Sequence, residues 1–239
     1  MPFTLFIMAA KTILIYNQLA TFFGPLHWWP MDHTYHIKNG SDPRFEVIIG
    51  AILTQNTAWS NVEKALVNLK NENNLDLHTI NHMDIESLKS FIKPSGFFNQ
   101  KANRLKIICS FLLEQYKGDL DALFSQPISN IRNELLKLNG IGPETADSIL
   151  LYAGNKPIFV VDSYTKRLCK RIPLSVDSTS YDMIQSYFQQ SLEKTYPKSQ
   201  LSQVYNEYHA AIVELAKQYC RKQKPQCMLC PIQNLCSYQ

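Results

Sequence analysis

Apolar side chains recur every three to four residues along most of the chain, which is the spacing of one buried face of an α-helix. Runs that alternate apolar and polar residues, as half-buried strands do, are almost absent. The pattern therefore predicts an all-α fold. The ranges that follow the helical period are 1–23, 45–53, 60–70, 84–92, 99–116, 128–138, 143–154, 164–171, 180–194 and 201–219.

One short apolar run departs from the helical period. Residues 158–161 read Ile-Phe-Val-Val, a composition typical of a buried strand. The chain offers no second run with which such a strand could pair, so we expect an extended linker. Asp162 or Ser163 then caps the helix that begins near residue 164.

Two expected helices meet near residue 55. Pro43 marks the start of the first helix, and Ser60 with Glu63 three residues later predicts a capping box at the start of the second. Gln55 and Asn56 thus lie in a junction between helices. Such junctions are exposed enough to contact a ligand.

Tryptophan is concentrated around these helices. Trp28 and Trp29 are adjacent in a loop between Gly24 and Pro30, and Trp59 lies at the end of the junction. Two adjacent indoles on a loop do not easily face one core. Either one anchors the loop while the other packs on a neighbouring element, or one of them forms the wall of a pocket.

The most informative stretch is residues 138–147, Leu-Asn-Gly-Ile-Gly-Pro-Glu-Thr-Ala-Asp. Gly140 and Gly142 flank Ile141 between two helical patterns, which predicts a very tight turn whose backbone N–H groups can face an anion. Pro143 suits the first turn of the second helix because its missing N–H is not needed there. We interpret the segment as a helix-hairpin-helix, a clamp for DNA phosphates.

The charge balance permits a nucleic-acid partner without requiring one. The 239 residues carry a formal net charge of +4, and lysine and arginine cluster at 166–171 and 221–224. Either cluster alone is more typical of a solvated surface. The apolar residues 1–10 lack a basic start and end at Lys11, too early to span a bilayer, so we expect a buried helix and a soluble, cytoplasmic protein without a membrane partner.

The six cysteines fall into two groups. Cys109 and Cys169 lie on apolar helix faces and are expected to be inert core residues. Four thiolates close in sequence can hold one metal centre, whereas disulfides do not suit a reducing compartment. These four follow the pattern C-x6-C-x2-C-x5-C in a short basic tail: Cys220, Cys227, Cys230 and Cys236.

The ligand set alone does not separate zinc from an iron–sulfur cluster, because four thiolates serve both. A single zinc usually lies between two close cysteine pairs, and only Cys227 and Cys230 form such a pair. We therefore favour a [4Fe–4S] cluster, with zinc as the alternative.

Five features, in this order along the chain, resemble the endonuclease III superfamily of helix-hairpin-helix DNA glycosylases. They are Ile-Leu-Thr-Gln-Asn-Thr at 52–57, Gly-Phe-Phe-Asn-Gln-Lys-Ala at 96–102, the hairpin at 138–142, Val161-Asp162 and the cysteine spacings. Together they cover nearly the whole chain from residue 45 onward.

The resemblance implies a two-lobed all-α fold. A six-helix barrel with the hairpin spans residues 44–155, and residues 1–43 and 156–239 form a second lobe that carries the cluster. It implies an intracellular, nucleoid-associated enzyme of base excision repair, acting as a monomer on double-stranded DNA that contains damaged bases. It also implies that Asp162 is the catalytic carboxylate at the mouth of the cleft.

One departure from the family sets the expected chemistry. Bifunctional members carry a nucleophilic lysine two residues after the second hairpin glycine, where this chain has Glu144. A carboxylate does not form the Schiff base that β-elimination requires. We therefore expect a hydrolase that removes a base without strong AP-lyase activity.

Within the superfamily, Trp28-Trp29-Pro30, Trp59 and Gly-Ile-Gly-x-Glu at the hairpin look most like 3-methyladenine DNA glycosylases of the endonuclease III type. That resemblance implies that Trp28 and Trp59 stack on an alkylated base and that Gln55 fills the gap left in the DNA. The four cysteines are a departure, since that enzyme type is known without the cluster. The other residues expected at the pocket or the DNA are Trp29, Glu144, Asn56, Asn99, Gly140, Ile141, Gly142 and Lys166.

Three alternatives stay open. A glycosylase that removes adenine, thymine or uracil from mismatches needs polar groups that read a neutral base, and no obvious polar set accompanies the tryptophans. A cluster-bearing DNA-binding or redox-sensing protein without turnover would not need Asp162. A structural zinc-binding DNA module would hold zinc in place of the iron–sulfur cluster.

Overall fold

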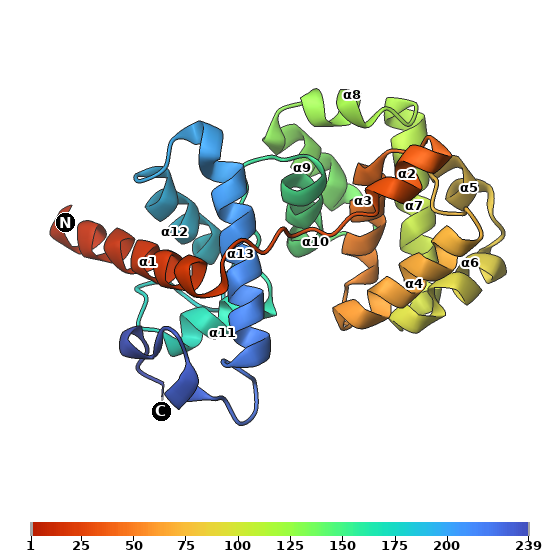
Figure 1. Ribbon diagram of the computed structural model, residues 1–239. Coiled ribbons are helices and arrows are strands. Elements are labelled where there is room, and N and C mark those ends of the chain that lie inside the picture. The colour runs from red at the N-terminus through yellow and green to blue at the C-terminus, as the bar shows by residue number, and fades with distance from the viewer. Residues whose placement is uncertain (1, 239) are drawn as a thin grey trace. The chain divides into compact units, whose positions relative to one another are not determined.

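The computed structural model describes the backbone of residues 2–238 and the side chains of residues 11–238. All regular elements in this part of the chain are helices and no strand occurs within it (Figure 1), which confirms the all-α prediction. The helices are α1 (Pro2–Phe23), α2 (His33–Asn39), α3 (Pro43–Leu53), α4 (Trp59–Asn71), α5 (Leu77–His82), α6 (Ile85–Ile92), α7 (Phe98–Tyr116), α8 (Leu120–Ser125), α9 (Ile128–Lys137), α10 (Pro143–Ser148), the π-helical turn η2 (Ile149–Ala153), α11 (Ser163–Arg171), α12 (Tyr181–Glu193) and α13 (Leu201–Gln218).

The chain divides into two compact units. The hairpin unit comprises Trp29–Gly154, and the cysteine unit comprises Met1–Trp28 together with Asn155–Gln239. The segment that contains α1 is therefore grouped with the C-terminal part of the chain, and the hairpin unit is one continuous stretch.

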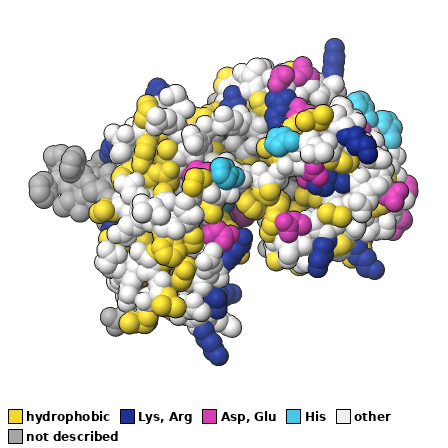
Figure 2. All heavy atoms as spheres, in the orientation of Figure 1, with side chains coloured by type: hydrophobic (Ala, Val, Ile, Leu, Met, Phe, Trp, Pro, Cys, Tyr) yellow, Lys and Arg dark blue, Asp and Glu magenta, His cyan; other side chains and the backbone are white. Residues whose placement is uncertain are grey.

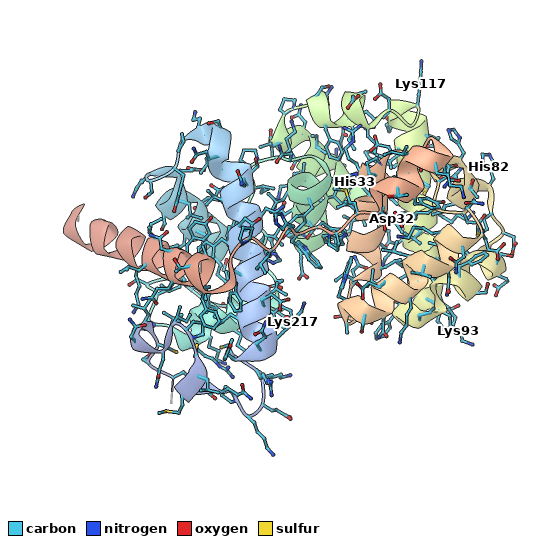
Figure 3. All side chains as sticks on the ribbon, in the orientation of Figure 1. Asp32, His33, His82, Lys93, Lys117 and Lys217 are labelled. Atoms are coloured by element: carbon cyan, nitrogen blue, oxygen red, sulfur yellow. The ribbon has the colours of Figure 1, made fainter. Side chains whose placement is uncertain are left out.

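Residues 29–43 belong to the hairpin unit, although the resemblance assigns them to the other lobe. The carboxylate of Glu46, buried on α3, accepts a hydrogen bond from the Asp32 N–H at 3.0 Å and lies 3.0 Å from His36 Nε2. Lys70 Nζ on α4 donates to the second oxygen of the Glu46 carboxylate at 3.1 Å. Asp32, at the start of this network, carries a label in Figure 3. This buried network ties the segment before α3 to α3 and α4, so the boundary falls after Trp28 and not after residue 43.

Helix α3 forms the core of the hairpin unit. Residues 45–53 are all buried, and α3 packs against α4, α7, α10 and η2. Helix α4 also packs on α6, while α5 and α6 pack on α7. The nearly continuous apolar sequence of α3 is what a helix covered on all sides requires.

The cysteine unit has an aromatic core. Phe159 stacks on Phe188 with ring centroids 4.6 Å apart, and Tyr208 meets both rings edge-on. Helix α1 packs on α12 and α13, and α11 packs on α13. Burial of these rings fixes the segment that contains Phe159, just before α11, against α12 and α13.

Residues 158–161 form an extended linker, as predicted. The Phe159 N–H donates to Gln189 Oε1 at 3.0 Å, and Gln185 Nε2 donates to the Phe159 carbonyl at 2.7 Å. Two glutamine side chains of α12 thus satisfy the backbone groups that a partner strand would otherwise satisfy.

The short elements differ from the predictions. Helix α4 begins at Trp59 after Ala58, which makes no side-chain capping bond, so the predicted capping box at Ser60 is wrong. The periodicity also missed α2, α5 and α8, which have six or seven residues each and are too short to show a period. Their signal is an aspartate that caps the first turn. These caps are Asp32, Asp76 and Asp119.

Cys109 and Cys169 are buried, as predicted. Within the described residues, no helix is long and apolar enough to cross a membrane. We expected residues 1–10 to be buried, but their side chains lie outside the part of the chain that the structure describes. On the face shown in Figure 2, basic, acidic and histidine side chains are interspersed over the hairpin unit.

Candidate functional site

The predicted hairpin joins α9 to α10. Gly140 has φ +85°, a backbone conformation that favours glycine, and Gly142 is the extended residue before α10 with Pro143 in the first turn. Ile141 is buried and its N–H donates to the Leu138 carbonyl at 3.1 Å, so its side chain anchors the turn in the core. The hairpin thus leads into a helix N-terminus, the arrangement that binds phosphate.

A buried ion pair holds the two hairpin helices together. Arg132 on α9 donates to Asp147 on α10 through Nε at 2.7 Å and through Nη2 at 3.1 Å. Asp147 is 0% exposed. The two parallel hydrogen bonds fix both distance and orientation, so the helices carry the turn as one rigid piece.

Gln55 lies next to the hairpin and is bound to it. Its Nε2 donates to the Gly140 carbonyl at 3.0 Å and to Thr145 Oγ1 at 2.9 Å, and its Oε1 accepts a hydrogen bond from Arg104. Asn56 is exposed with φ +54°. The junction after α3 and the hairpin therefore form one continuous site, with Gln55 half-buried between them.

A buried lysine brings a third loop to this site. Lys101 on α7 is 0% exposed and donates to the carbonyls of Leu53 at 2.8 Å and Ser95 at 2.7 Å. Burial, with Arg104 nearby, lowers the pKa of Lys101 to about 8. Its two bonds tie the end of α3, where Gln55 lies, to the loop before α7.

Phe97 in that loop is a residue that the sequence reasoning missed. Its side chain is 61% exposed and its φ is +47°, a conformation that bulky residues rarely adopt. Asn99, exposed in the first turn of α7, follows it. The sequence signal was weak: a glycine followed by two aromatics before a helix.

Trp29 is an anchor of the hairpin unit. It is 8% exposed, its ring stands perpendicular to that of Trp59 at 5.1 Å, and Tyr152 lies 5.4 Å away. Gly50 on α3 makes room for it, because a Cβ at that position would lie 2.8 Å from Trp29 Cζ2. Trp59 is half-buried and so keeps part of its surface accessible.

Trp28 belongs to the cysteine unit and has different neighbours. Its half-buried ring has Lys217 Nζ of α13 at 5.9 Å from the centroid, within cation–π range. Lys217, labelled in Figure 3, also pairs with Glu214 at 2.9 Å. A positive charge therefore already lies beside the indole that the resemblance assigns to a cationic base.

Asp162 caps α11, as predicted. Its Oδ1 accepts hydrogen bonds from the Thr165 N–H at 2.7 Å and from Thr165 Oγ1 at 3.0 Å, and its Oδ2 lies 3.6 Å from His209 Nε2. Burial acts to raise the pKa of Asp162, but His209 and Thr165 outweigh it and lower the pKa below its ordinary value. The carboxylate is therefore ionised at neutral pH.

His209 is a second residue that the sequence reasoning missed. It is buried on α13, 47 positions after Asp162, and only the packing of α11 on α13 brings the two together. A single histidine inside an apolar helical pattern gives no sign of such a partner.

Half of the basic cluster at 166–171 is structural. Arg167 Nε donates to the Cys220 carbonyl at 2.8 Å, and Arg171 donates to Cys220 Sγ at 3.2 Å and to the Arg221 carbonyl at 2.8 Å. Lys166 is half-buried and Lys170 is exposed on the same helix. The two arginines therefore hold the cysteine loop on α11, and the lysines are left for other contacts.

The four C-terminal cysteines line one small cavity. Arg171 and Tyr238 line it with them, the guanidinium 4.3 Å from the centroid of the Tyr238 ring, and all four thiols are free of disulfides. In the part of the chain that is described, no three His, Cys, Asp or Glu side chains are placed to hold a single metal ion. The cavity itself contains Cys220, Cys227, Cys230 and Cys236.

Glu144 is exposed in the first turn of α10, two residues after Gly142. Its backbone carbonyl accepts a hydrogen bond from Ser148 Oγ at 2.7 Å. An acidic side chain suits the positive end of the helix dipole, so a helix-stabilising role accounts for it without reference to a ligand.

Comparison with known proteins identifies relatives over nearly the whole chain. A family model described as HhH-GPD superfamily base excision DNA repair protein matches residues 49–194. A Methanocaldococcus jannaschii protein, MJ1434, whose name gives it provisionally as a DNA repair glycosylase, is 43% identical over 229 residues, which are 93% of this chain and 94% of that protein. Endonuclease III of Thermotoga maritima is 30% identical over 199 residues, 83% of this chain and 84% of that protein.

A solved structure resembles this chain over nearly its whole length. The 3-methyladenine DNA glycosylase MagIII of H. pylori, bound to 1,N6-ethenoadenine, superimposes with a TM-score of 0.70 at 31% identity. The match covers 90% of this chain and 97% of that one.

Proposed function

The chain belongs to the HhH-GPD superfamily of base excision DNA repair proteins, and on this premise we propose that it is a monofunctional DNA glycosylase that hydrolyses the N-glycosidic bond of alkylated, 3-methyladenine-like bases. The proposal is supported by two separate features of the chain: Asp162 is a buried carboxylate that is ionised at neutral pH, and Glu144 stands where the resemblance places the lysine of strand-cutting members.

Asp162 supplies the charge that the reaction needs. As the base leaves, positive charge develops on the sugar, and a fixed carboxylate stabilises that charge or orients the attacking water. The two carboxylate oxygens of Asp162 have different neighbours: Oδ1 caps α11 through Thr165, while Oδ2 is the oxygen on the His209 side. Because the cap uses Oδ1, we assign the catalytic role to Oδ2.

Glu144 excludes the lyase step at this position. Strand cleavage by β-elimination needs an amine that forms a Schiff base with the sugar aldehyde, and a carboxylate forms none. The product is an intact strand with an abasic site. Borohydride treatment during the reaction should therefore trap no covalent adduct with DNA.

Methylation at N3 or N7 gives a purine a positive charge and a labile glycosidic bond, so recognition matters more than protonation of the leaving group. Trp59 keeps an accessible surface for such a base, and Trp29 packs edge-on against its ring. We assign Trp28 of the cysteine unit to the base on the resemblance alone. A flat cation on an indole gains roughly 0.5–2 kcal/mol.

The position of Lys217 favours a second candidate, a neutral base. Its ammonium lies beside the Trp28 ring, so a cationic base on that ring meets a like charge. A neutral adduct, such as the 1,N6-ethenoadenine bound to the H. pylori relative, meets none.

Double-stranded DNA is the proposed partner of the hairpin unit, and the chain acts on it as a monomer. Backbone N–H groups at Gly140 and Gly142 bind phosphate, and Ile141 keeps the turn in place. Extruding the damaged nucleotide costs a few kcal/mol, and Gln55 fills the gap that it leaves. The exposed residues that complete this surface are Asn56, Phe97 and Asn99, and Lys166 of the cysteine unit is assigned to phosphate.

The four cysteines fit a [4Fe–4S] cluster. They are free thiols around one cavity, and Arg171 donates a hydrogen bond to Cys220 Sγ, as a donor to a thiolate ligand does. Bound there, the cluster would supply a structural centre for the loop and take no part in base removal. Iron and zinc analysis of the purified protein decides between the cluster and the zinc alternative.

A panel of duplexes tests the function. Each duplex carries one lesion: an alkylated purine, 1,N6-ethenoadenine, uracil, a thymine mismatch or an oxidised pyrimidine. Strand breaks that appear only after alkali, and only on the purine adducts, support the proposal. Breaks on the mismatch or oxidised substrates alone, or breaks without alkali, would overturn it.

A further inference from the structure

The amide of Gln55 is occupied by the protein. A glutamine amide has two N–H donors, and both are used, one on the Gly140 carbonyl and one on Thr145 Oγ1. The amide oxygen accepts from the Arg104 guanidinium. In this docked arrangement the side chain has no donor left for a base.

Arg104 lies against both Gln55 and Gly140 of the hairpin. Its side chain crosses directly over the hairpin, since a Cβ on Gly140 would lie 2.7 Å from Arg104 Cδ and 2.8 Å from its Cγ. The guanidinium at the end of the same side chain reaches Gln55. Gly140 is thus needed both for its φ of +85° and for the passage of Arg104.

We propose that Arg104 is a specificity-determining residue, because it holds Gln55 docked on the hairpin and so sets the cost at which Gln55 enters DNA. The inference rests on the proposed function, in which Gln55 replaces the extruded nucleotide. Docking and insertion exclude each other, since all three hydrogen bonds must break before the side chain can leave. A gap in the base stack repays that loss, and an intact base pair does not.

The test measures binding, because binding needs no catalysis. Arg104→Met keeps the aliphatic stem over Gly140 and removes the charged hydrogen bond. The apparent affinity for a ligand is proportional to the fraction of the protein that is in the binding-competent state. The affinity for a duplex with a tetrahydrofuran abasic site, relative to the undamaged duplex, should therefore rise by about tenfold, which is the scale of one charged hydrogen bond. Taking the ratio cancels the general loss of one positive charge.

Two further variants isolate Gln55. Thr145→Val removes a neutral partner of Gln55 without changing charge, and the ratio should rise by roughly two- to threefold. Lys106→Met removes another cation of α7, one that donates to the carbonyls of Ile80 and Asn81, and it should leave the ratio unchanged. In a Gln55→Ala background, Arg104→Met should have no effect on the ratio.

A ratio that falls or stays constant in a folded Arg104→Met protein would overturn the inference, and so would a rise that persists in the Gln55→Ala background. If Arg104→Met does not fold, Thr145→Val decides by the same criterion. A chain that excises no base but shows the rise would refute the proposed function and leave the docking of Gln55 supported.

Discussion

Replacing Arg132 with methionine should destabilise the hairpin unit strongly. Asp147 is fully buried and accepts hydrogen bonds from Arg132 Nε at 2.7 Å and from Arg132 Nη2 at 3.1 Å. Removing one partner of a buried ion pair costs about 3–5 kcal/mol, because the other charge stays desolvated. Against an unfolding free energy of about 5–15 kcal/mol this is a large fraction. It corresponds to a fall in Tm on the order of 10 °C.

Urea and thermal unfolding followed by circular dichroism measure the effect, and two variants serve as its controls. Asp121→Asn breaks an exposed pair with Arg44, 2.7 Å in length, and should cost less than about 1 kcal/mol. Arg132→Met combined with Asp147→Leu removes both charges of this pair, so most of the lost stability should return. A loss in Arg132→Met no larger than that of Asp121→Asn, or a double variant no more stable than the single one, would show that the buried ion pair does not stabilise the hairpin unit in this way.

Three further outcomes are expected. Asp162→Asn should lower the single-turnover excision rate by about 10²–10⁴-fold while binding to abasic DNA persists, and an unchanged rate would remove Asp162 from the reaction. His209→Leu takes away a contact that lowers the pKa of Asp162 while burial still raises it, so the acid limb of the pH–rate profile should move to higher pH; a limb that stays in place would show that His209 does not act on Asp162. Lys217→Met should raise the excision of 7-methylguanine relative to 1,N6-ethenoadenine by roughly two- to tenfold, and a constant ratio would mean that the base does not meet the Trp28 ring.

Local chemistry explains which features the sequence could predict. The hairpin follows from two glycines and a proline at fixed offsets, and the capping role of Asp162 follows from its place before a helical pattern. The extended linker follows from a strand-like composition without a second strand. Each rests on residues within a few positions of one another, where backbone rules are strong.

Long-range pairing explains what the sequence did not predict. Gln55 was expected at an exposed junction, but Arg104, 49 positions later, and the hairpin, 85 positions later, hold it half-buried. Lys101 is a fully buried cation because it donates to two carbonyls from distant parts of the chain, Leu53 at the end of α3 and Ser95 before α7. No periodicity or capping signal encodes such meetings, since they depend on how α3, α7 and α10 pack.

The short helices were missed for a different reason. With six or seven residues, α2, α5 and α8 complete fewer than two turns of the helical period. Their sequence signal is local: each begins after a capping aspartate, which marks a helix start without any period.

We propose that this chain removes a methylated purine by hydrolysis and leaves the strand intact. Chromatography of the free bases released from methylated duplex DNA, with strand breaks counted in the same samples before and after alkali, tests this activity. We expect free methylated purine in a one-to-one ratio with alkali-labile sites, and no excess of breaks before alkali. Absence of free base, or breaks that accumulate without alkali as fast as base is released, would contradict it.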